Sequence, residues 1–307
     1  MLWYDILMKE CLTDKIASTY LGKKVSGSVN YDPSLLVAVP RVENRKQYDI
    51  SNQALPFIGY DVWHAYEFSV MTNNGLPITR VLKLKYSCES EFIVESKSLK
   101  LYLNSFNMSR LGENVADTLE KCAKLIKNDL SEVLRTNVDV CFLDSYVEKV
   151  EIFGEFVNML SLIKEDELVV NEFKEAPHLL KLDVTTEKQK HFLMFDSLRS
   201  NCRVTHQPDF GEVFIYYNSK KHILEASLIQ YLSSFRSEFH FHEECCEMIY
   251  KRLFDLLDSD DELFVCALYT RRGGIDICPS RYSCNCTYKG VESLFNLSKF
   301  ARSGIKQ

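Results

Sequence analysis

The sequence contains no apolar run approaching the roughly 20 residues that a membrane-spanning helix needs, although 46% of its 307 residues are hydrophobic. Its first residues, Met1-Leu-Trp-Tyr-Asp5, also lack the basic and apolar regions of a secretory signal. We therefore expect a soluble, cytoplasmic protein that does not bind membranes. The length suits two domains of ordinary size or one large domain.

A basic stripe of the kind that binds nucleic acid is also missing. The 37 Lys and Arg residues are interspersed with 43 Asp and Glu residues, which leaves a net charge of −6. Because nucleic-acid binding requires clustered positive charge, we expect a small-molecule partner and no nucleic acid.

The cysteines form neither a disulfide framework nor a zinc motif. They number eleven, and this odd count, scattered along the chain, suits a reducing cytosol. Two groups have to be considered as metal ligands: Cys278 with Cys284 and Cys286, and Cys245-Cys246 with His240 and His242. Neither group contains a C-x2-C pair with a second pair downstream, so we expect no metal.

The order of the predicted elements repeats along the chain. The hydrophobic pattern from Asp61 predicts strand, strand, helix, helix, strand, strand, and the same order returns from about Arg199. The helical stretch Leu99 to Phe106 matches Leu228 to Phe235 at five of eight positions (Leu, Tyr, Leu, Ser and Phe). Such self-similarity indicates a duplicated α+β unit. We divide the chain into an N-terminal extension with wrapping loops at 1–60, a first module at 61–190 and a second module at 191–307.

The stretch from Ser200 to Gly211 combines reactive groups with a turn signal. Cys202, His206 and Asp209 fall within eight residues, and Pro-Asp-Phe-Gly stands between two apolar runs. A thiol becomes a nucleophile at neutral pH only beside a cation, a helix N-terminus or a base, and His206 or Asp209 could supply that help. The alternative is that Cys202 is a small buried hydrophobe, His206 a satisfied polar residue and Asp209 an ordinary turn residue.

A second candidate site lies where a predicted strand ends at Glu95 and a helix follows. Ser96 lies near the predicted helix N-cap, so this corner has free backbone N–H groups. Lys97 and Lys100 correspond to Ala226 and Ile229 in the second copy. The loss of both lysines in a copy that keeps its apolar residues favours a function for the first copy, and a solvated helix face is the alternative.

Four motifs resemble those of one family. They are Val94-Glu95-Ser96-Lys97-Ser98-Leu99-Lys100 through Phe106, Ser200-Asn-Cys202 through Asp209, Phe241-His242-Glu243, and Tyr269-Thr-Arg-Arg272-Gly273-Gly-Ile-Asp276. Together they resemble the long, two-module form of 7-cyano-7-deazaguanine reductase, the NADPH-dependent nitrile reductase of queuosine biosynthesis, in the tunnelling-fold superfamily. The likeness covers roughly residues 28–107 and 195–282.

The resemblance implies two tandem tunnelling-fold modules, each an antiparallel four-stranded sheet with two helices on one face. It implies that Cys202 is the nucleophile and Asp209 the proton donor, with His242 relaying protons or shielding an imine. The implied binding contacts are Val94, Glu95, Ser96, His242 and Glu243 with the deazapurine, and Ser96, Lys97, Arg272 and Gly273 with NADPH. A homodimer is implied as well, because members of this superfamily close their sheets into barrels through oligomers.

The cofactor would not be held by a Rossmann domain, because no G-x-G-x-x-G motif follows a predicted strand. The implied reaction begins when Cys202 attacks the nitrile carbon to give a covalent thioimide. Asp209 would supply a proton from a carboxyl group kept partly neutral by burial. Two hydrides from NADPH would then give the amine.

The sequence departs from the family pattern at three places. Phe239-His240 stands where the family often has Asn-Glu, and Cys278 stands where Asn often precedes the proline. Ser280-Arg281-Tyr282 lacks the aromatic residue expected before Arg-Ser. These departures concern the shape of the cofactor pocket and not the reaction.

Three other functions have to be weighed: a thiol-dependent hydrolase, a purine-binding module that has lost catalysis, and a zinc hydrolase of the GTP cyclohydrolase type. Oxidation of NADPH in the presence of the nitrile separates the reductase from the thiol hydrolase. The presence of both Cys202 and Asp209 argues against a module without catalysis. The missing metal spacing argues against the zinc hydrolase.

Overall fold

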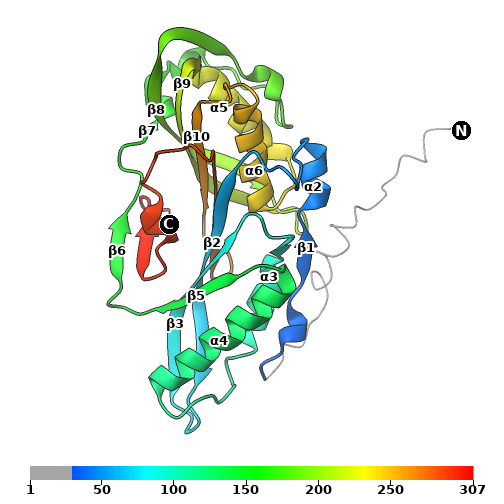
Figure 1. Cartoon of the computed structure of the whole chain (residues 1–307), viewed down its shortest axis with the longest axis vertical. Helices are drawn as coiled ribbons and strands as arrows, with labels where there is room; N and C mark the ends of the chain where they lie inside the picture. The colour runs from blue at the N-terminus through cyan, green and yellow to red at the C-terminus, as the bar shows by residue number, and fades with distance from the viewer. Residues whose placement is uncertain (1–29, 307) are drawn as a thin grey trace, which may run out of the picture.

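The structure, a computed structural model, describes residues 30–306 and combines one large β-sheet with the longer helices on one of its faces (Figure 1). The eight strands of this sheet lie in the order β5-β3-β2-β11-β10-β9-β8-β7. Neighbouring strands are antiparallel, except that the short β7 (Val157–Asn158) runs parallel to β8. The predicted α+β class is confirmed. Residues 1–29 of the predicted N-terminal extension lie outside the described residues.

The first half of the chain supplies three strands of the sheet and two helices. The strands are β2 (Ile58–Met71), β3 (Pro77–Ser87) and β5 (Val138–Leu143), and the helices are α3 (Ser96–Asn104) and α4 (Val115–Leu134). Leu99 and Tyr102 of α3, with Ile126 of α4, are buried against Leu82 and Leu84 of β3. The helical spacing of these apolar residues therefore gives each helix one face for the sheet.

The expectation of a fourth strand in the first sheet is wrong. The strand predicted near Lys149 is present as β6 (Glu148–Glu151), but it leaves the large sheet and pairs in parallel with β12 (Lys299–Arg302). Its residues are exposed except for the half-buried Val150. Because β6 has no continuous apolar face, burial does not hold it on the main sheet.

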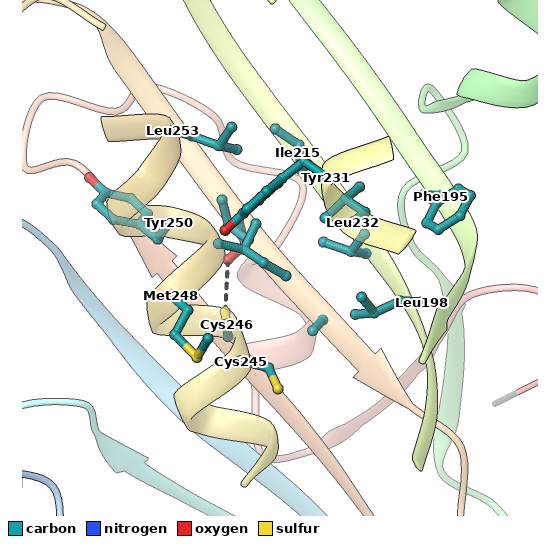
Figure 2. Close-up of a cluster of buried hydrophobic side chains, with 14 of the residues drawn as sticks. Phe195, Leu198, Ile215, Tyr231, Leu232, Cys245, Cys246, Met248, Tyr250 and Leu253 are labelled. Carbon is teal, nitrogen blue, oxygen red and sulfur yellow. Dashed lines mark hydrogen bonds between the residues drawn. The ribbon is translucent and has the colours of Figure 1, made fainter. Parts of the chain in front are cut away.

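The second half supplies four antiparallel strands and two helices. The strands are β8 (Leu182–Asn201), β9 (Pro208–Ile223), β10 (Glu262–Tyr269) and β11 (Ile275–Tyr282), and the helices are α5 (Glu225–Ser233) and α6 (His242–Phe254). Figure 2 shows their shared core, in which the labelled side chains come from two strands and both helices: Phe195, Leu198, Ile215, Tyr231, Leu232, Cys245, Cys246, Met248, Tyr250 and Leu253.

Cys245 and Cys246 pack in this core as small hydrophobic residues. Burial raises the pKa of both thiols, to about 12 for Cys245. Cys246 Sγ lies 3.7 Å from the Val265 carbonyl oxygen (Figure 2). Among the described residues, neither of the two cysteine groups considered from the sequence comes together as a set of metal ligands.

The two halves share one sheet because β11 pairs with β2 along its whole length, from Ile275 opposite Ala65 to Tyr282 opposite Ile58. The boundary placed after residue 60 falls inside β2, and the boundary placed after residue 190 falls inside β8. Both strands therefore continue across the predicted boundaries, and the division into modules remains a prediction.

The other face of the sheet carries a separate core. Phe153 stacks on Phe214 with ring centroids 4.4 Å apart, and Cys278 and Leu294 pack in the same cluster. The C-terminal segment with α7 (Glu292–Phe295) and β12 covers this face (Figure 1).

Five buried charged residues connect the N-terminal segment with the junction of β2 and β11. Arg281 of β11 contacts Asp61 of β2 at 2.8 Å and Glu247 of α6 at 2.9 Å. Arg41 pairs with Asp61 at 2.5 Å, and Arg45 pairs with Glu247 at 2.7 Å. Arg41 is the N-cap of α2 (Val42–Gln47), and Arg45 lies within this helix. The preceding strand, β1 (Ala38–Pro40), pairs with β4 (Phe92–Val94). We call these five residues the buried charge cluster.

We predict that Glu247→Gln destabilises the protein by about 3–5 kcal/mol, because the buried Arg45 loses its ionised partner and the buried Arg281 loses one of two. Glu151→Gln is the control, since its pair with Arg302 is exposed and such pairs contribute at most about 1 kcal/mol. Urea unfolding at pH 7 measures both changes. Equal effects of the two substitutions would contradict the prediction.

Candidate active site

One pocket lies on the helix-covered face of the sheet, at the junction of the two halves. It is lined by the β4–α3 corner, the β8–β9 turn, the start of α6 and the β10–β11 turn. Every site residue implied by the family resemblance lines it: Val94, Glu95, Ser96, Lys97, Cys202, Asp209, His242, Glu243, Arg272 and Gly273. The fold therefore joins the first-half corner to the second-half cysteine within one chain.

Glu95 is the N-cap of α3. The sequence predicted this cap near Ser96, the next residue. The Glu95 carboxylate accepts hydrogen bonds from the backbone N–H groups of Lys97 (2.9 Å) and Ser98 (2.6 Å). Ser96 is the first helical residue. Burial raises the pKa of Glu95, although the two N–H donors oppose this shift. A carboxylate has about four lone-pair directions, so Glu95 can cap the helix and still accept donors from the pocket.

Cys202 begins the turn between β8 and β9. Its N–H donates to the Gln207 carbonyl oxygen (2.8 Å), and its own carbonyl oxygen accepts from the N–H of His206 (2.9 Å). The turn is tight, and His206 has a φ of 58°. The His206 ring packs on Phe239 with centroids 4.8 Å apart and is not a lining residue of the pocket. The turn thus presents Cys202 and Asp209 to the pocket and directs His206 elsewhere.

Asp209 is buried between two basic side chains. It accepts a hydrogen bond from the Arg272 guanidinium, and its Oδ2 lies 3.4 Å from His242 Nε2. Burial by itself raises the pKa of Asp209, but His242 and Arg272 outweigh burial and hold the pKa below its ordinary value. The expected partly neutral carboxyl group is therefore not found, because the sequence did not reveal the pairing with Arg272.

His242 is the first residue of α6 and stacks face to face on Tyr269 of β10. The ring centroids are 3.8 Å apart and the planes differ by 4°. Because the imidazole is held between Tyr269 and Asp209, its Nε2 has a defined direction in the pocket.

Glu243 is buried beside the charge cluster and is 1% exposed. Burial, followed by the negative charge of Asp61, raises its pKa to about 8, although Arg41 and Arg281 act in the opposite direction. Its Oε1 has no hydrogen-bond partner among the described residues. An oxygen of this kind is available to a donor on a bound molecule.

Basic groups surround one side of the pocket. Lys97 is exposed, and Lys100 Nζ donates to the Gly273 carbonyl oxygen at 2.5 Å. Gly273 has a φ of 57°, and a Cβ at this position would lie 3.1 Å from Lys100 Nζ. Glycine therefore lets the backbone turn here and leaves space beside the Lys100 ammonium.

Sequence reasoning missed the apolar walls of the pocket, which are formed by Trp63, Val204, Phe241, Ile275 and Ile277. Trp63 of β2 lies directly opposite Ile277 of β11. Only the pairing of β2 with β11 brings these two residues together, and neither strand carries a local signal for that pairing. Lys100, Thr205 and His240 also line the pocket.

No helix among residues 30–306 combines the length and the apolar character needed to cross a bilayer.

Family comparisons identify both halves of the chain. The family described as "Nitrile reductase, 7-cyano-7-deazaguanine-reductase N-term" matches residues 28–142, and the family described as "QueF-like protein" matches residues 208–287. The chain therefore belongs to the 7-cyano-7-deazaguanine reductase family of nitrile reductases, as the four motifs indicated.

Individual relatives match over nearly the whole length. A protein of Colwellia psychrerythraea is 36% identical over 273 residues, which cover 88% of this chain and 93% of the relative. A protein of Rickettsia massiliae is 38% identical over 270 residues, covering 87% and 93%, and one of Rickettsia bellii is 37% identical over 272 residues, with the same coverage. All three are named NADPH-dependent 7-cyano-7-deazaguanine reductase.

Proposed function

We propose that this chain reduces 7-cyano-7-deazaguanine to 7-aminomethyl-7-deazaguanine with NADPH, in queuosine biosynthesis, through a covalent thioimide on Cys202. The observation that carries the proposal is the placement of Cys202 and Asp209 in one pocket with two buried carboxyl groups, Glu95 and Glu243, and a basic rim. The names of the relatives support the same reaction.

The first step is addition of the thiol across the nitrile. Asp209 is ionised, because Arg272 and His242 hold its pKa low, so it acts first as a base toward the Cys202 thiol. The thiolate forms the C–S bond, and Asp209 passes the same proton to the nitrile nitrogen. The product is a neutral thioimide, and no proton is taken from solvent in this step.

Reduction of the thioimide to the amine requires two hydrides and two protons. NADPH, when bound, supplies the hydrides. After the first hydride arrives, the C–S bond breaks and Cys202 is released, leaving an imine that accepts the second. Asp209 and His242, with Oδ2 and Nε2 3.4 Å apart, form a path along which protons reach the nitrogen. Trp63 and Phe241 limit access of water, which would hydrolyse a free imine.

The two buried carboxyl groups fit the edge of the substrate. The amino-pyrimidinone edge carries adjacent N–H donors, and an ionised carboxylate accepts two such bonds side by side. Glu95 is already oriented by its helix cap, and Glu243 has an oxygen without a partner. Lys97 and Arg272 would hold the phosphates of NADPH, with Gly273 allowing close backbone approach.

Incubation with 7-cyano-7-deazaguanine in the absence of NADPH tests the nucleophile and the substrate class together. We expect the intact mass to rise by one nitrile molecule in wild type and not in Cys202→Ala. Cys284→Ala, which removes an exposed cysteine, is the matched control and should form the adduct normally. Addition of NADPH should then discharge the adduct, with two NADPH oxidised per nitrile.

No adduct on folded wild type would contradict the proposal and favour a binding module or a changed substrate. An adduct that water releases without oxidation of NADPH would favour a thiol-dependent hydrolase.

The raised pKa of Glu243 predicts a pH-dependent affinity. Below about 8 the carboxyl group is protonated and accepts the substrate N–H groups poorly. We expect the affinity of Cys202→Ala for the nitrile to rise about tenfold per unit as pH increases from 6 toward 8, and then to level off. Isothermal titration calorimetry measures this affinity at each pH. When Glu243→Gln is added to Cys202→Ala, binding should be weak and independent of pH. An affinity that does not change with pH in Cys202→Ala, where Glu243 is intact, would contradict the prediction.

We further propose that the two halves are tunnelling-fold modules, the first of which contributes three strands to the shared sheet, and that the enzyme acts in the cytoplasm as a homodimer. β5 supports the dimer, because the described strands pair with it on one side only. Its other edge offers backbone groups to a second sheet. Sedimentation velocity at micromolar concentration should give twice the mass of the chain, and a fully active monomer would contradict the dimer.

A further inference from the structure

Two histidines and a glutamate meet at the corner where β9 ends and α5 begins. None of the three lines the pocket described above. They are His191 of β8, His222 of β9 and Glu225, the first residue of α5. One ring nitrogen of each histidine and one carboxylate oxygen lie within 4.8 Å of one another.

The two imidazoles are held in a stack. The His191 ring lies parallel to Tyr217, with centroids 4.4 Å apart and planes 14° apart, and parallel to His222, at 4.7 Å and 13°. Because the lone pairs of the ring nitrogens lie in the ring planes, one imidazole has to turn out of this stack before both can point at one cation.

The donor atoms are not all satisfied within the protein. His222 Nε2 lies 2.9 Å from Glu225 Oε1, so these two atoms share a proton. His191 Nε2 is buried and has no hydrogen-bond partner among the described residues. A buried nitrogen without a partner is costly unless a further group completes the site.

The corner is accessible to an ion from solvent. The side chains of His222 and Glu225 are 27% and 20% exposed. In the duplicated unit, where Leu228 corresponds to Leu99, Glu225 occupies the place of Ser96, next to the cap of α3 in the pocket. The same corner of the second copy therefore carries a different set of donors.

We propose that His191, His222 and Glu225 bind a divalent transition-metal cation of the Zn²⁺ class, with water completing a four-coordinate site. Two imidazoles and one carboxylate are a ligand set that suits Zn²⁺ and its neighbours. Metal–ligand distances of about 2.0–2.2 Å require the donor atoms to be roughly 3.3 Å apart. His222 Nε2 and Glu225 Oε1 already lie 2.9 Å apart, so the side chain that has to move toward the cation is that of His191. The cation replaces the proton shared by His222 and Glu225.

A second group with suitable ligand types, His64, Asp276 and Cys278, does not support a cation site as well. Asp276 already accepts hydrogen bonds from His64 (2.8 Å) and from Tyr66 (2.5 Å). The group is buried on the other face of the sheet, and the buried Lys83 ammonium acts on Asp276 and Cys278 electrostatically. A cation would have to enter a closed site whose carboxylate already has two hydrogen-bond donors and a lysine nearby.

Titration of the untagged, full-length protein with Zn²⁺ after removal of metals by chelation tests the proposal. We expect one equivalent to bind and Tm to rise with Zn²⁺ concentration. His191→Ala and Glu225→Gln should each weaken binding at least roughly tenfold and abolish the rise in Tm. His178→Ala is the matched control, since it removes a histidine from an exposed pair with Glu172, and it should bind Zn²⁺ as wild type does.

The test has two results that would overturn the proposal. Unchanged Zn²⁺ binding in both His191→Ala and Glu225→Gln would mean that the ion binds adventitiously. Loss of binding in Cys278→Ser, with a sulfur-to-metal absorption band when Co²⁺ replaces Zn²⁺, would place the cation at the other group. Circular dichroism of the metal-free variants confirms that they fold, and nitrile adduct formation should be unaffected by Glu225→Gln.

Discussion

Three guanidinium groups and two carboxylates buried at the junction of β2 and β11 hold the molecule together at one point. Charged groups removed from water cost several kcal/mol each unless they are fully paired, so these five side chains can occupy only positions in which every charge has a partner. Asp61 comes from the first half, Glu247 and Arg281 come from the second, and Arg41 and Arg45 come from the N-terminal segment. Burial alone would raise the pKa of Glu247, but Arg45 and Arg281 hold it at about 2.

This constraint extends directly into the pocket. Glu243 lies one helical turn before Glu247 on α6, and residues four apart share a helix face. The pairing that fixes Glu247 therefore also fixes Glu243, whose pKa rises to about 8 by burial and the charge of Asp61. Asp209 is buried as well, yet its pKa falls because His242 and Arg272 contact it. Two carboxyl groups in one pocket therefore have pKa values shifted in opposite directions, Asp209 downward and Glu243 upward.

The sequence predicted the local features of the site because each depends on neighbours in the chain. The turn that presents Cys202 and Asp209, the corner at Glu95 and the helix that starts at His242 were all visible as short-range patterns. Contacts between distant residues were not visible. The pairing of Arg272 with Asp209, the departure of β6 to β12 and the wall formed by Trp63 and Ile277 depend on which strands become neighbours. Arg41 and Arg45 fell in a region interpreted as wrapping loops, although they are among the most buried charges of the described chain.

The candidate site draws on both halves of the chain. The first half provides the corner with Glu95, and the second provides the turn with Cys202, so neither half alone lines the whole pocket. Joining the copies edge to edge through β2 and β11 places the corner and the turn on the same face of one sheet. The equivalent corner of the second half, where β9 ends and α5 begins, does not line this pocket. Its cap position is Leu224, with His222 and Glu225 on either side, so the repeat has kept its packing while its chemistry has diverged.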